Sequence, residues 1–342
     1  MEAKKRNFLI ILCSVLLVVL VAYLVIAFVP KNINHKGANP MRKDGKLPIL
    51  IAHGGGNREF PDNTLEAFYN AYSVDENVMM ETDVSITKDG VILLSHDTTI
   101  DRKTDNVGEI SEWNYTDLIA MEVDFSYTNP TDGNQQLSGE RKRFTNPDGV
   151  EVTPHDVLYP EGVEPRHATK FLATTLEDLL VSFPYNRINV EIKQEGELGK
   201  KAFEATVKLL EKYDAFDRVV LASFHDELYD LYQARQNDGS LPKEFMCSPG
   251  IGGVVKFYIL HCLQLDLFFA DKMSVFQLPM EEYGINLATK EFVAKAHAHN
   301  LAVHYWTINN PDDMRYLISI GADGIMTDYP HLLKEVYNEY TK

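Results

Sequence analysis

The chain has 342 residues and a formal net charge of −17, and this length fits one large domain or two ordinary ones. The acidic balance argues against a nucleic-acid partner, because binding a polyphosphate requires clustered Lys and Arg. It does not argue against one phosphate group, whose charge a single lysine and a metal ion can neutralise locally. The three cysteines lack metal-site spacing. Because Cys13 lies in an apolar segment, at most one intradomain disulfide, Cys247–Cys262, is possible, and unpaired thiols are favoured.

The N-terminal region predicts a membrane anchor. Residues 8–29 carry no charge and are long and apolar enough to span a bilayer as one helix, after a short tail at 1–7. A cleaved signal peptide has a shorter apolar core and a small-residue cleavage site, so an uncleaved anchor is favoured. Lysines and arginines flank both ends, so the positive-inside rule does not decide the orientation. A short N-terminal tail usually stays inside, so we expect a single-pass cell-membrane protein with an extracytoplasmic catalytic domain. Residues 30–46, rich in Asn, Gly and Lys, read as a tether.

From residue 47 to the C-terminus, short runs rich in Val and Ile alternate with helical patterns. Strands are expected to end near eight residues: His53, Asp83, His96, Lys193, His225, Met280, Thr307 and Asp328. Helices are expected from a capping box at Asn63–Glu66, from Thr175, and over 199–213, 290–300, 311–320 and 330–340. This alternation predicts an α/β fold, a TIM (β/α)8 barrel over 47–342. The polar stretch of about 124–170 shows no periodicity and is expected to be an insertion on the active-site rim.

Acidic residues follow or occupy the buried strands and predict a metal site. Side chains alternate along a strand, so Glu81 and Asp83 share one face, as do Glu191 and Lys193. Three carboxylates can supply oxygen ligands to Ca²⁺ or Mg²⁺, with water and substrate oxygens completing the shell. The alternative is pairing with surface bases, which the apolar neighbours of these acids disfavour. We therefore predict a divalent metal held by Glu81, Asp83 and Glu191.

Histidines at two strand ends predict proton-transfer chemistry. His53 and His96 lie within reach across a barrel mouth, where one takes a proton and the other gives one. Either alone is equally a structural residue; with the acids, catalysis is favoured. Lys193 supplies positive charge to a phosphoryl oxygen or forms a salt bridge with a ligand acid, and both can hold together. Trp306 is either an apolar substrate wall or a barrel-core aromatic. Four further histidines are set apart: His297 and His299 are expected at the surface, and His225 and His304 are left unassigned.

Eight short stretches, in this order, resemble motifs of the glycerophosphodiester phosphodiesterase family. They are 51–55, 61–64, 81–84, 87–90, 95–97, 190–193, 305–309 and 321–330. The resemblance implies a TIM barrel that hydrolyses a glycerophosphodiester to an alcohol and glycerol 3-phosphate with a divalent cation. It also implies roles for six residues. Glu81, Asp83 and Glu191 would bind the metal, His53 would accept a proton, His96 would donate one to the leaving alkoxide, and Lys193 would bind phosphate.

Two positions depart from the family pattern. Gly54 stands where the family usually has an arginine that grips the phosphate, and Asp62 stands where it usually has Glu. Losing an arginine removes a bidentate phosphate contact, for which Arg58 is the expected substitute. These departures leave open a catalytically impaired binding homologue. A transferase resembling sphingomyelinase D, which forms a cyclic phosphate, uses the same acids and histidines and is a third possibility.

The segment 257–269 bears on the choice of substrate, because it is unusually apolar. Together with the anchor, it resembles the membrane-bound family members that act as lysophospholipase D on single-chain lipids. The alternative, a buried barrel strand and helix, is favoured. A deacylated lipid such as glycerophosphocholine or glycerophosphoethanolamine is therefore the first choice of substrate. A lysophospholipid, hydrolysed to lysophosphatidic acid, is the second.

Overall fold

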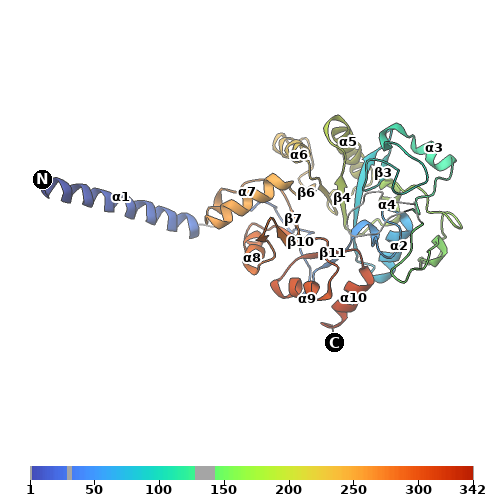
Figure 1. Ribbon diagram of the computed structural model, residues 1–342. Coiled ribbons are helices and arrows are strands. Elements are labelled where there is room, and N and C mark those ends of the chain that lie inside the picture. Colours follow the sequence, from blue (N-terminus) through green and yellow to red (C-terminus); the bar gives the residue numbers. More distant parts are fainter. Residues whose placement is uncertain (1, 29–32, 128–142, 342) are drawn as a thin grey trace.

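The computed structural model describes residues 2–28, 33–127 and 143–341, which form a barrel and one long N-terminal helix (Figure 1). Parallel strands of these described residues follow the order β6-β5-β4-β2-β1-β11-β10-β7. They are β1 Ile49–Ala52, β2 Met79–Ile86, β4 Ile188–Ile192, β5 Val219–Ala222, β6 Met246–Cys247, β7 Val275–Leu278, β10 Ala302–Tyr305 and β11 Gly324–Thr327. The N–H of Ser274, just before β7, donates to the carbonyl of Cys247 in β6 at 2.9 Å. This contact nearly closes the circle, and the expected TIM barrel is confirmed.

Helices surround these strands and, with one exception, bury their apolar faces against them (Figure 1). They are α2 Leu65–Val74, α3 Tyr115–Ala120, α4 Leu176–Ser182, α5 Gly196–Lys212, α6 Asp226–Asp238, α7 Ile251–Cys262, α8 Lys290–Ala298, α9 Pro311–Ile320 and α10 Pro330–Asn338. The exception is α3, whose Leu118 packs in a separate cluster with Leu93 of a strand outside the circle. In α5, Phe203, Val207 and Leu210 lie on the buried face, as their spacing predicts. The cap of α2 is Thr64, whose hydroxyl accepts from the N–H of Ala67, rather than Asn63.

One expected barrel strand is not part of the barrel. The strand before His96 is β3 Ile92–Leu94, which pairs antiparallel with β2 outside the circle. Only residues 87–91 separate the two strands, whereas a parallel pair needs a crossover of about a dozen residues or more. The eighth barrel strand is β6, which was not predicted because its two residues in the described structure are too few to show a periodicity.

The polar stretch at about 124–170 is described from 124 to 127 and from 143 to 170, and residues 128–142 lie outside the described residues. Its described part packs beside α2. The Arg166 Nη2 atom lies 3.2 Å from Oε2 of Glu66, and the ring centroids of Tyr159 and Tyr69 lie 5.2 Å apart. This stretch therefore covers the outside of the barrel next to α2.

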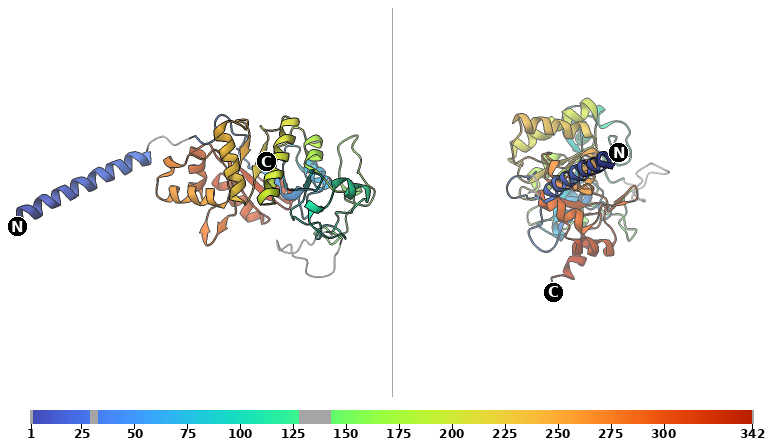
Figure 2. Two further views of the ribbon diagram at one scale, coloured as in Figure 1. Left: turned by 90° about the horizontal axis from the view of Figure 1, so that it is seen from above. Right: turned by 90° about the vertical axis from the view of Figure 1, so that its left-hand side faces the viewer.

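The N-terminal helix α1, Glu2–Phe28, extends away from the barrel (Figure 2). Its segment Lys4–Ile26 is long and apolar enough to cross a membrane. The residues after it, which we expected to form a tether, contact the barrel. The side chain of Asn34 donates to the carbonyl of Asp271 at 2.7 Å, and Asn39 donates to that of Ser274 at 2.7 Å. Met41 is fully buried inside the barrel with Ile51, where its carbonyl lies 2.8 Å from Nε2 of His304.

Two further expectations are settled by burial. His299 was expected at the surface, but its side chain is fully buried, with Nδ1 2.7 Å from Oδ1 of Asn34. The reason is that the segment around Asn34, which follows α1, packs over the end of α8 and covers His299. The cysteines are free, as favoured: Cys13 and Cys262 are exposed and Cys247 is buried.

Candidate active site

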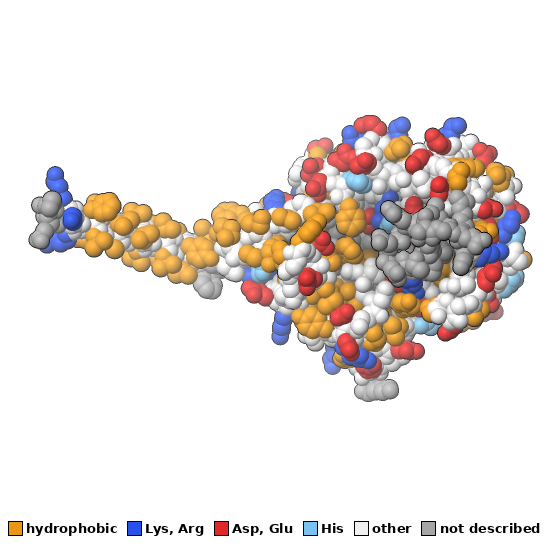
Figure 3. Space-filling view, in the orientation of Figure 1, with side chains coloured by type: hydrophobic (Ala, Val, Ile, Leu, Met, Phe, Trp, Pro, Cys, Tyr) orange, Lys and Arg blue, Asp and Glu red, His pale blue; other side chains and the backbone are white. Residues whose placement is uncertain are grey.

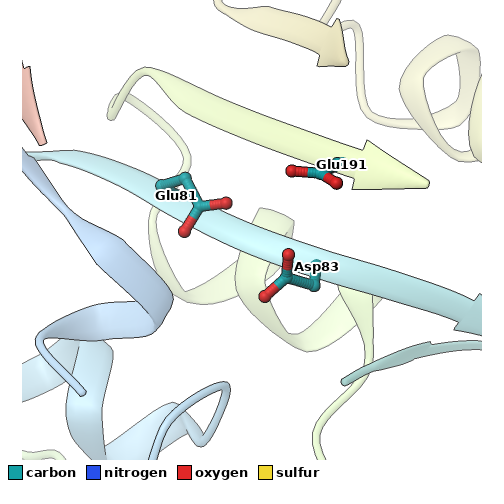
Figure 4. A group of neighbouring side chains, drawn as sticks. All are labelled: Glu81, Asp83 and Glu191. Atoms are coloured by element: carbon teal, nitrogen blue, oxygen red, sulfur yellow. The ribbon is translucent and has the colours of Figure 1, made fainter. Parts of the chain in front are cut away.

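The carboxylate cluster is built by two adjacent strands. Glu81 and Asp83 come from β2 and Glu191 from β4, and the parallel register pairs Asp83 directly with Glu191 (Figure 4). Paired residues in a parallel ladder point to the same side of the sheet. One ligand atom from each of the three carboxylates lies within 4.8 Å of the others. These three acids can therefore hold a divalent cation, and they are the residues that the sequence predicted.

Lys193 lies among these acids. Its Nζ atom is 2.9 Å from Oδ1 of Asp83 and 2.6 Å from Oε1 of Glu191. The salt-bridge interpretation of Lys193 therefore holds, and a phosphate contact requires Nζ to be shared or to turn. One ammonium group faces three carboxylates, which leaves the cluster short of positive charge.

The pKa values of the acids express this shortage. Burial, followed by the charge of Asp83, raises the pKa of Glu81 to about 8. Burial also raises the pKa of Glu191, against the opposing charge of Lys193. The pKa of Asp83 falls to about 2, because Lys193 and the two imidazoles outweigh the opposing effect of burial. Added positive charge is needed to keep all three acids ionised at neutral pH, as a divalent cation would supply.

Two backbone turns hold the acids in place. The N–H of Gly54, just after β1, donates to Oε2 of Glu81 at 2.8 Å. Asn63 has a positive φ of 57°, and its Nδ2 donates to Oδ2 of Asp83 at 3.0 Å. The left-handed backbone at Asn63 explains why this residue does not cap α2: its side chain points to the acids instead. Asn63 is thus a positioning residue that the sequence analysis misassigned.

His53 is oriented by a carboxylate that the sequence analysis left without a role. Its Nδ1 lies 2.6 Å from Oδ1 of Asp328, which directly follows β11. Asn309 donates from Nδ2 to the other oxygen of Asp328 at 2.6 Å. Because an ionised carboxylate only accepts, Nδ1 carries the proton and Nε2 is the nitrogen left for substrate. Burial would lower the pKa of His53, but Asp328 and Glu81 raise it to about 10.

His96 is also oriented by a carboxylate at Nδ1. Its Nδ1 lies 3.0 Å from Oδ1 of Asp97, whose second oxygen accepts from Nε of Arg102 at 2.7 Å. Arg102 also donates to Asp62 through both terminal nitrogens, at 3.0 and 3.1 Å. The family departure at Asp62 is therefore part of a buried ion-pair network that holds His96 and Asp97.

The other departure, Gly54, leaves little room for a side chain. Its φ is +54°, and an added Cβ would lie 3.2 Å from Cβ of Asp62. Arg58, the expected substitute, lines the cavity, with Nε 3.9 Å from Oδ2 of Asp328. The structure therefore brings a guanidinium to the site from the turn before α2, although not from the position that the family uses.

These side chains surround one cavity of about 1040 Å³. His53, Arg58, Glu81, His96, Glu191 and Lys193 line one part of it. Opposite lies an apolar wall formed by α7, by the hairpin β8 Glu281–Glu282 and β9 Ile285–Asn286, and by Trp306. Trp306 packs edge-on against Phe224 with ring centroids 5.9 Å apart and also touches the barrel core. Trp306 thus packs against the core and also lines the cavity, and its role as a substrate wall stays a prediction. His225 and His304, which were left unassigned, contact backbone carbonyls of Lys193 and Met41.

A parallel barrel that carries a carboxylate cluster, flanked by the carboxylate-supported imidazoles of His53 after β1 and His96 after β3, has the architecture of a TIM-barrel enzyme. Residues 53–332 match the model of the glycerophosphoryl diester phosphodiesterase family. The chain belongs to this family and is a phosphodiesterase, as the motifs predicted.

Three similar proteins illustrate the range of the family. A probable glycerophosphodiester phosphodiesterase 2 of Mycobacterium tuberculosis is 26% identical over 86% of this chain and 96% of its own length. The lysophospholipase D GDPD1 of Rattus norvegicus is 23% identical over 87% of this chain and 88% of its own. The solved structure of an Oleispira antarctica phosphodiesterase in complex with the product sn-glycerol-3-phosphate has a TM-score of 0.58. It is 19% identical and covers 85% of this chain and 97% of that one.

Proposed function

We propose that this protein hydrolyses glycerophosphodiesters such as glycerophosphocholine and glycerophosphoethanolamine to an alcohol and glycerol 3-phosphate, using Ca²⁺ or Mg²⁺. The observation that carries this proposal is the meeting of three carboxylates within 4.8 Å and two imidazoles around one cavity. A divalent cation held by Glu81, Asp83 and Glu191 would polarise a phosphoryl oxygen and offset the charge that builds up on the phosphoryl group.

The protein's own residues divide the remaining work. Arg58 and Lys193 bind phosphoryl oxygens, and they stabilise the charge of the transition state. His53 accepts a proton at Nε2 from the attacking water, whose oxygen forms the new bond to phosphorus, and His96 donates a proton to the leaving alkoxide oxygen as its bond to phosphorus breaks. Asp328 and Asp97 hold the two rings through Nδ1, at 2.6 and 3.0 Å.

The electrostatics couple metal binding to base catalysis. Against the opposing effect of burial, the hydrogen bond to Asp328, followed by the charge of Glu81, raises the pKa of His53 to about 10, and the charge of Asp83 adds to this effect. Positive charge beside these acids offsets the interactions that raise this pKa. A cation bound by Glu81 and Asp83 would therefore lower the pKa of His53 by the part that these two acids contribute, and would favour its role as a base.

A product assay on the full-length protein in detergent tests the proposal. Glycerophosphocholine and glycerophosphoethanolamine are supplied with Mg²⁺ or Ca²⁺, and again with an excess of chelator. Release of glycerol 3-phosphate that the chelator abolishes supports the hydrolase. A cyclic phosphate product would instead indicate the transferase, and substrate binding without turnover would indicate the impaired homologue.

Lysophospholipase D activity is a second candidate, favoured by the apolar wall opposite the acids. Val254, Val255 and Ile259 of α7 line the cavity together with Trp306. A head group needs no such wall, whereas an acyl chain does. The rat relative named lysophospholipase D supports the same candidate. Lysophosphatidylcholine belongs in the same assay, with lysophosphatidic acid as the expected product.

We also propose that α1 is an uncleaved anchor that leaves the barrel on the extracytoplasmic side of the cell membrane. The support is the 0% burial of its most apolar window, which leaves the segment Lys4–Ile26 available to lipid. Protease protection in intact cells, with an epitope at the C-terminus, tests the orientation. Digestion of the epitope from outside is the expected result.

A further inference from the structure

Helix α7 is apolar on both sides, although one of them faces solvent. Its inner side packs into the core, where Phe257 contacts the rings of Phe269, Phe276 and Phe292. Its outer side carries one row of exposed apolar residues at a spacing of four: Ile251, Val255, Ile259 and Leu263 at its end. Each of these side chains is between 49% and 58% exposed. A helix that is apolar all round is normally buried in protein or in lipid.

The exposed surface extends beyond the helix. Phe268, in the turn after α7, is 58% exposed, and Lys256 is the one charged residue within the sequence of α7 apart from its histidine. Lys256 is paired with Asp271, with 2.5 Å between Nζ and Oδ1. We call the row of four residues together with Phe268 the α7 face. A contiguous apolar patch of this kind marks an interaction site.

The end of α1 lies directly beside this face. The hydroxyl of Tyr23 in α1 donates to the carbonyl of Leu263 at 3.1 Å. In the space-filling view, hydrophobic side chains run without a break from α1 onto the neighbouring part of the barrel (Figure 3). Tyrosine near the end of a spanning helix is typical of the membrane interface, so Leu263 lies at that depth.

The chain itself keeps the barrel at the membrane. Helix α1 ends at Phe28, and the backbone N–H of Asn34 already donates to the carbonyl of His299 on the barrel at 3.1 Å. Six residues span at most about 20 Å when fully extended. The end of the barrel that carries His299 therefore stays within about 20 Å of the end of α1, and the contact of Tyr23 with Leu263 puts the α7 face beside that helix.

We propose that the α7 face docks by its end at Leu263 and Phe268 into the headgroup and acyl boundary of the bilayer that α1 spans, and that the active-site cavity is filled from that bilayer. This inference rests on the anchor and the hydrolase proposed above. The row runs for about 18 Å from Leu263 to Ile251 at 1.5 Å per residue. Its upper members Ile251, Val255 and Ile259 also line the cavity, so one apolar strip joins the membrane to the metal site.

A second copy of the chain and water are the two alternatives to a bilayer at this surface, and the bilayer is better supported than either. A second copy of the chain would cover the α7 face with an equally apolar patch, but it would not explain why α1 lies beside this face. If water covered this surface, five large apolar side chains would be exposed to it in one place. A bilayer accounts for both the apolar row and the contact between Tyr23 and Leu263.

A depth measurement tests the docking independently of turnover. The exposed thiol of Cys262 is labelled with an environment-sensitive fluorophore in full-length protein carrying Cys13→Ser, reconstituted in phosphatidylcholine vesicles. Burial raises the pKa of the Cys247 thiol, so this cysteine stays unreactive. The matched control places the label at Tyr185→Cys, a 93% exposed position, in protein that also carries Cys262→Ser.

We expect blue-shifted emission from the Cys262 label that spin-labelled lipids quench, and solvent-like, unquenched emission from the control label. Solvent-like emission from both labels overturns the docking. Blue-shifted emission that lipid quenchers do not affect also overturns it, since it indicates a second protein copy as the partner. Neither reading needs an active enzyme, so a failure of the hydrolase proposal is recorded separately by the product assay.

A substrate comparison then tests the route from the bilayer. Leu263→Glu with Phe268→Glu changes exposed residues that do not line the cavity, and Val181→Glu places a charge on an exposed apolar residue of α4. The double variant is expected to hydrolyse lysophosphatidylcholine in vesicles roughly tenfold more slowly or worse, and glycerophosphocholine in solution at the original rate. Equal losses on both substrates, or none on either, contradict the route.

Discussion

The two walls of the cavity are built in different ways. The acidic wall consists of side chains from β2 and β4, which are held by the sheet register and by hydrogen bonds from Gly54, Asn63 and Lys193. The apolar wall consists of α7 and the β8–β9 hairpin, whose side chains are partly exposed and make few polar contacts among the described residues. We therefore expect the chemistry to depend on the acidic, rigid wall and the choice of substrate to depend on the apolar wall, which fewer polar contacts hold in place.

Removing a histidine from the rigid wall should cause the largest loss. His53→Ala and His96→Ala are each expected to lower kcat by roughly 10²–10⁴-fold, because a positioned acid or base contributes about that much. Steady-state release of glycerol 3-phosphate from glycerophosphocholine measures the effect. His155→Ala, at an exposed site, is the control. An undiminished rate in His96→Ala would remove this residue from the acid role.

The second prediction concerns the residue that positions the metal ligand. Asn63→Ala removes the amide that donates to Asp83, and it should weaken the apparent metal affinity roughly 10–100-fold. A titration of Mg²⁺ or Ca²⁺ against activity gives this value, and kcat at saturating metal should change much less. Asn77→Ala, at an exposed site, should leave the titration unaltered. A fall in kcat at unchanged metal affinity would mean that Asn63 acts otherwise than by holding Asp83.

The rigid wall was also the part that the sequence predicted best. Two-residue alternation was enough to put Glu81 and Asp83 on one face of their strand, and the pairing of β2 with β4 then brought Glu191 to them. The strand before His96 was misplaced, although its five-residue connection at 87–91 already excluded a parallel crossover. Asp328 was overlooked as a partner of His53, yet it follows a buried strand like the other residues of the rim.

The sequence could not predict features that depend on contacts between segments far apart in the chain. The two-residue strand β6 has no periodicity of its own and exists because β5 supplies its hydrogen bonds. His299 is buried because the segment around Asn34 covers it, over a separation of 265 residues. The exposed row of α7 could not be predicted from the sequence either, because the composition of this helix is also that of a helix buried in the core. We had favoured burial for the apolar segment 257–269, and only its inner side is buried.

The third prediction concerns Arg58, the expected phosphate ligand. Arg58 lines the cavity beside Asp328, and it offers the guanidinium that Gly54 lacks. Arg58→Ala is expected to raise KM for glycerophosphocholine roughly tenfold, because charge-assisted contacts to phosphate are among the stronger hydrogen bonds. Arg58→Lys should recover only part of the loss, since an ammonium group cannot bind in a bidentate manner. Arg315→Ala on α9, whose guanidinium pairs with Glu339 and does not line the cavity, is the control. A KM unchanged in Arg58→Ala would leave the phosphate to Lys193 alone.

The smallest effects are expected on the apolar wall, and they should depend on the substrate. Val255→Ala trims a half-exposed side chain that lines the cavity, and we expect KM for lysophosphatidylcholine to rise only a few-fold, in keeping with the small apolar area that is lost. KM for glycerophosphocholine should stay the same, because a deacylated substrate has nothing to place against α7. Val181→Ala, equally exposed on α4, should affect neither. A similar rise for both substrates would mean that α7 shapes the phosphate site itself, and the division of the cavity into a chemical wall and a selective wall would then fail.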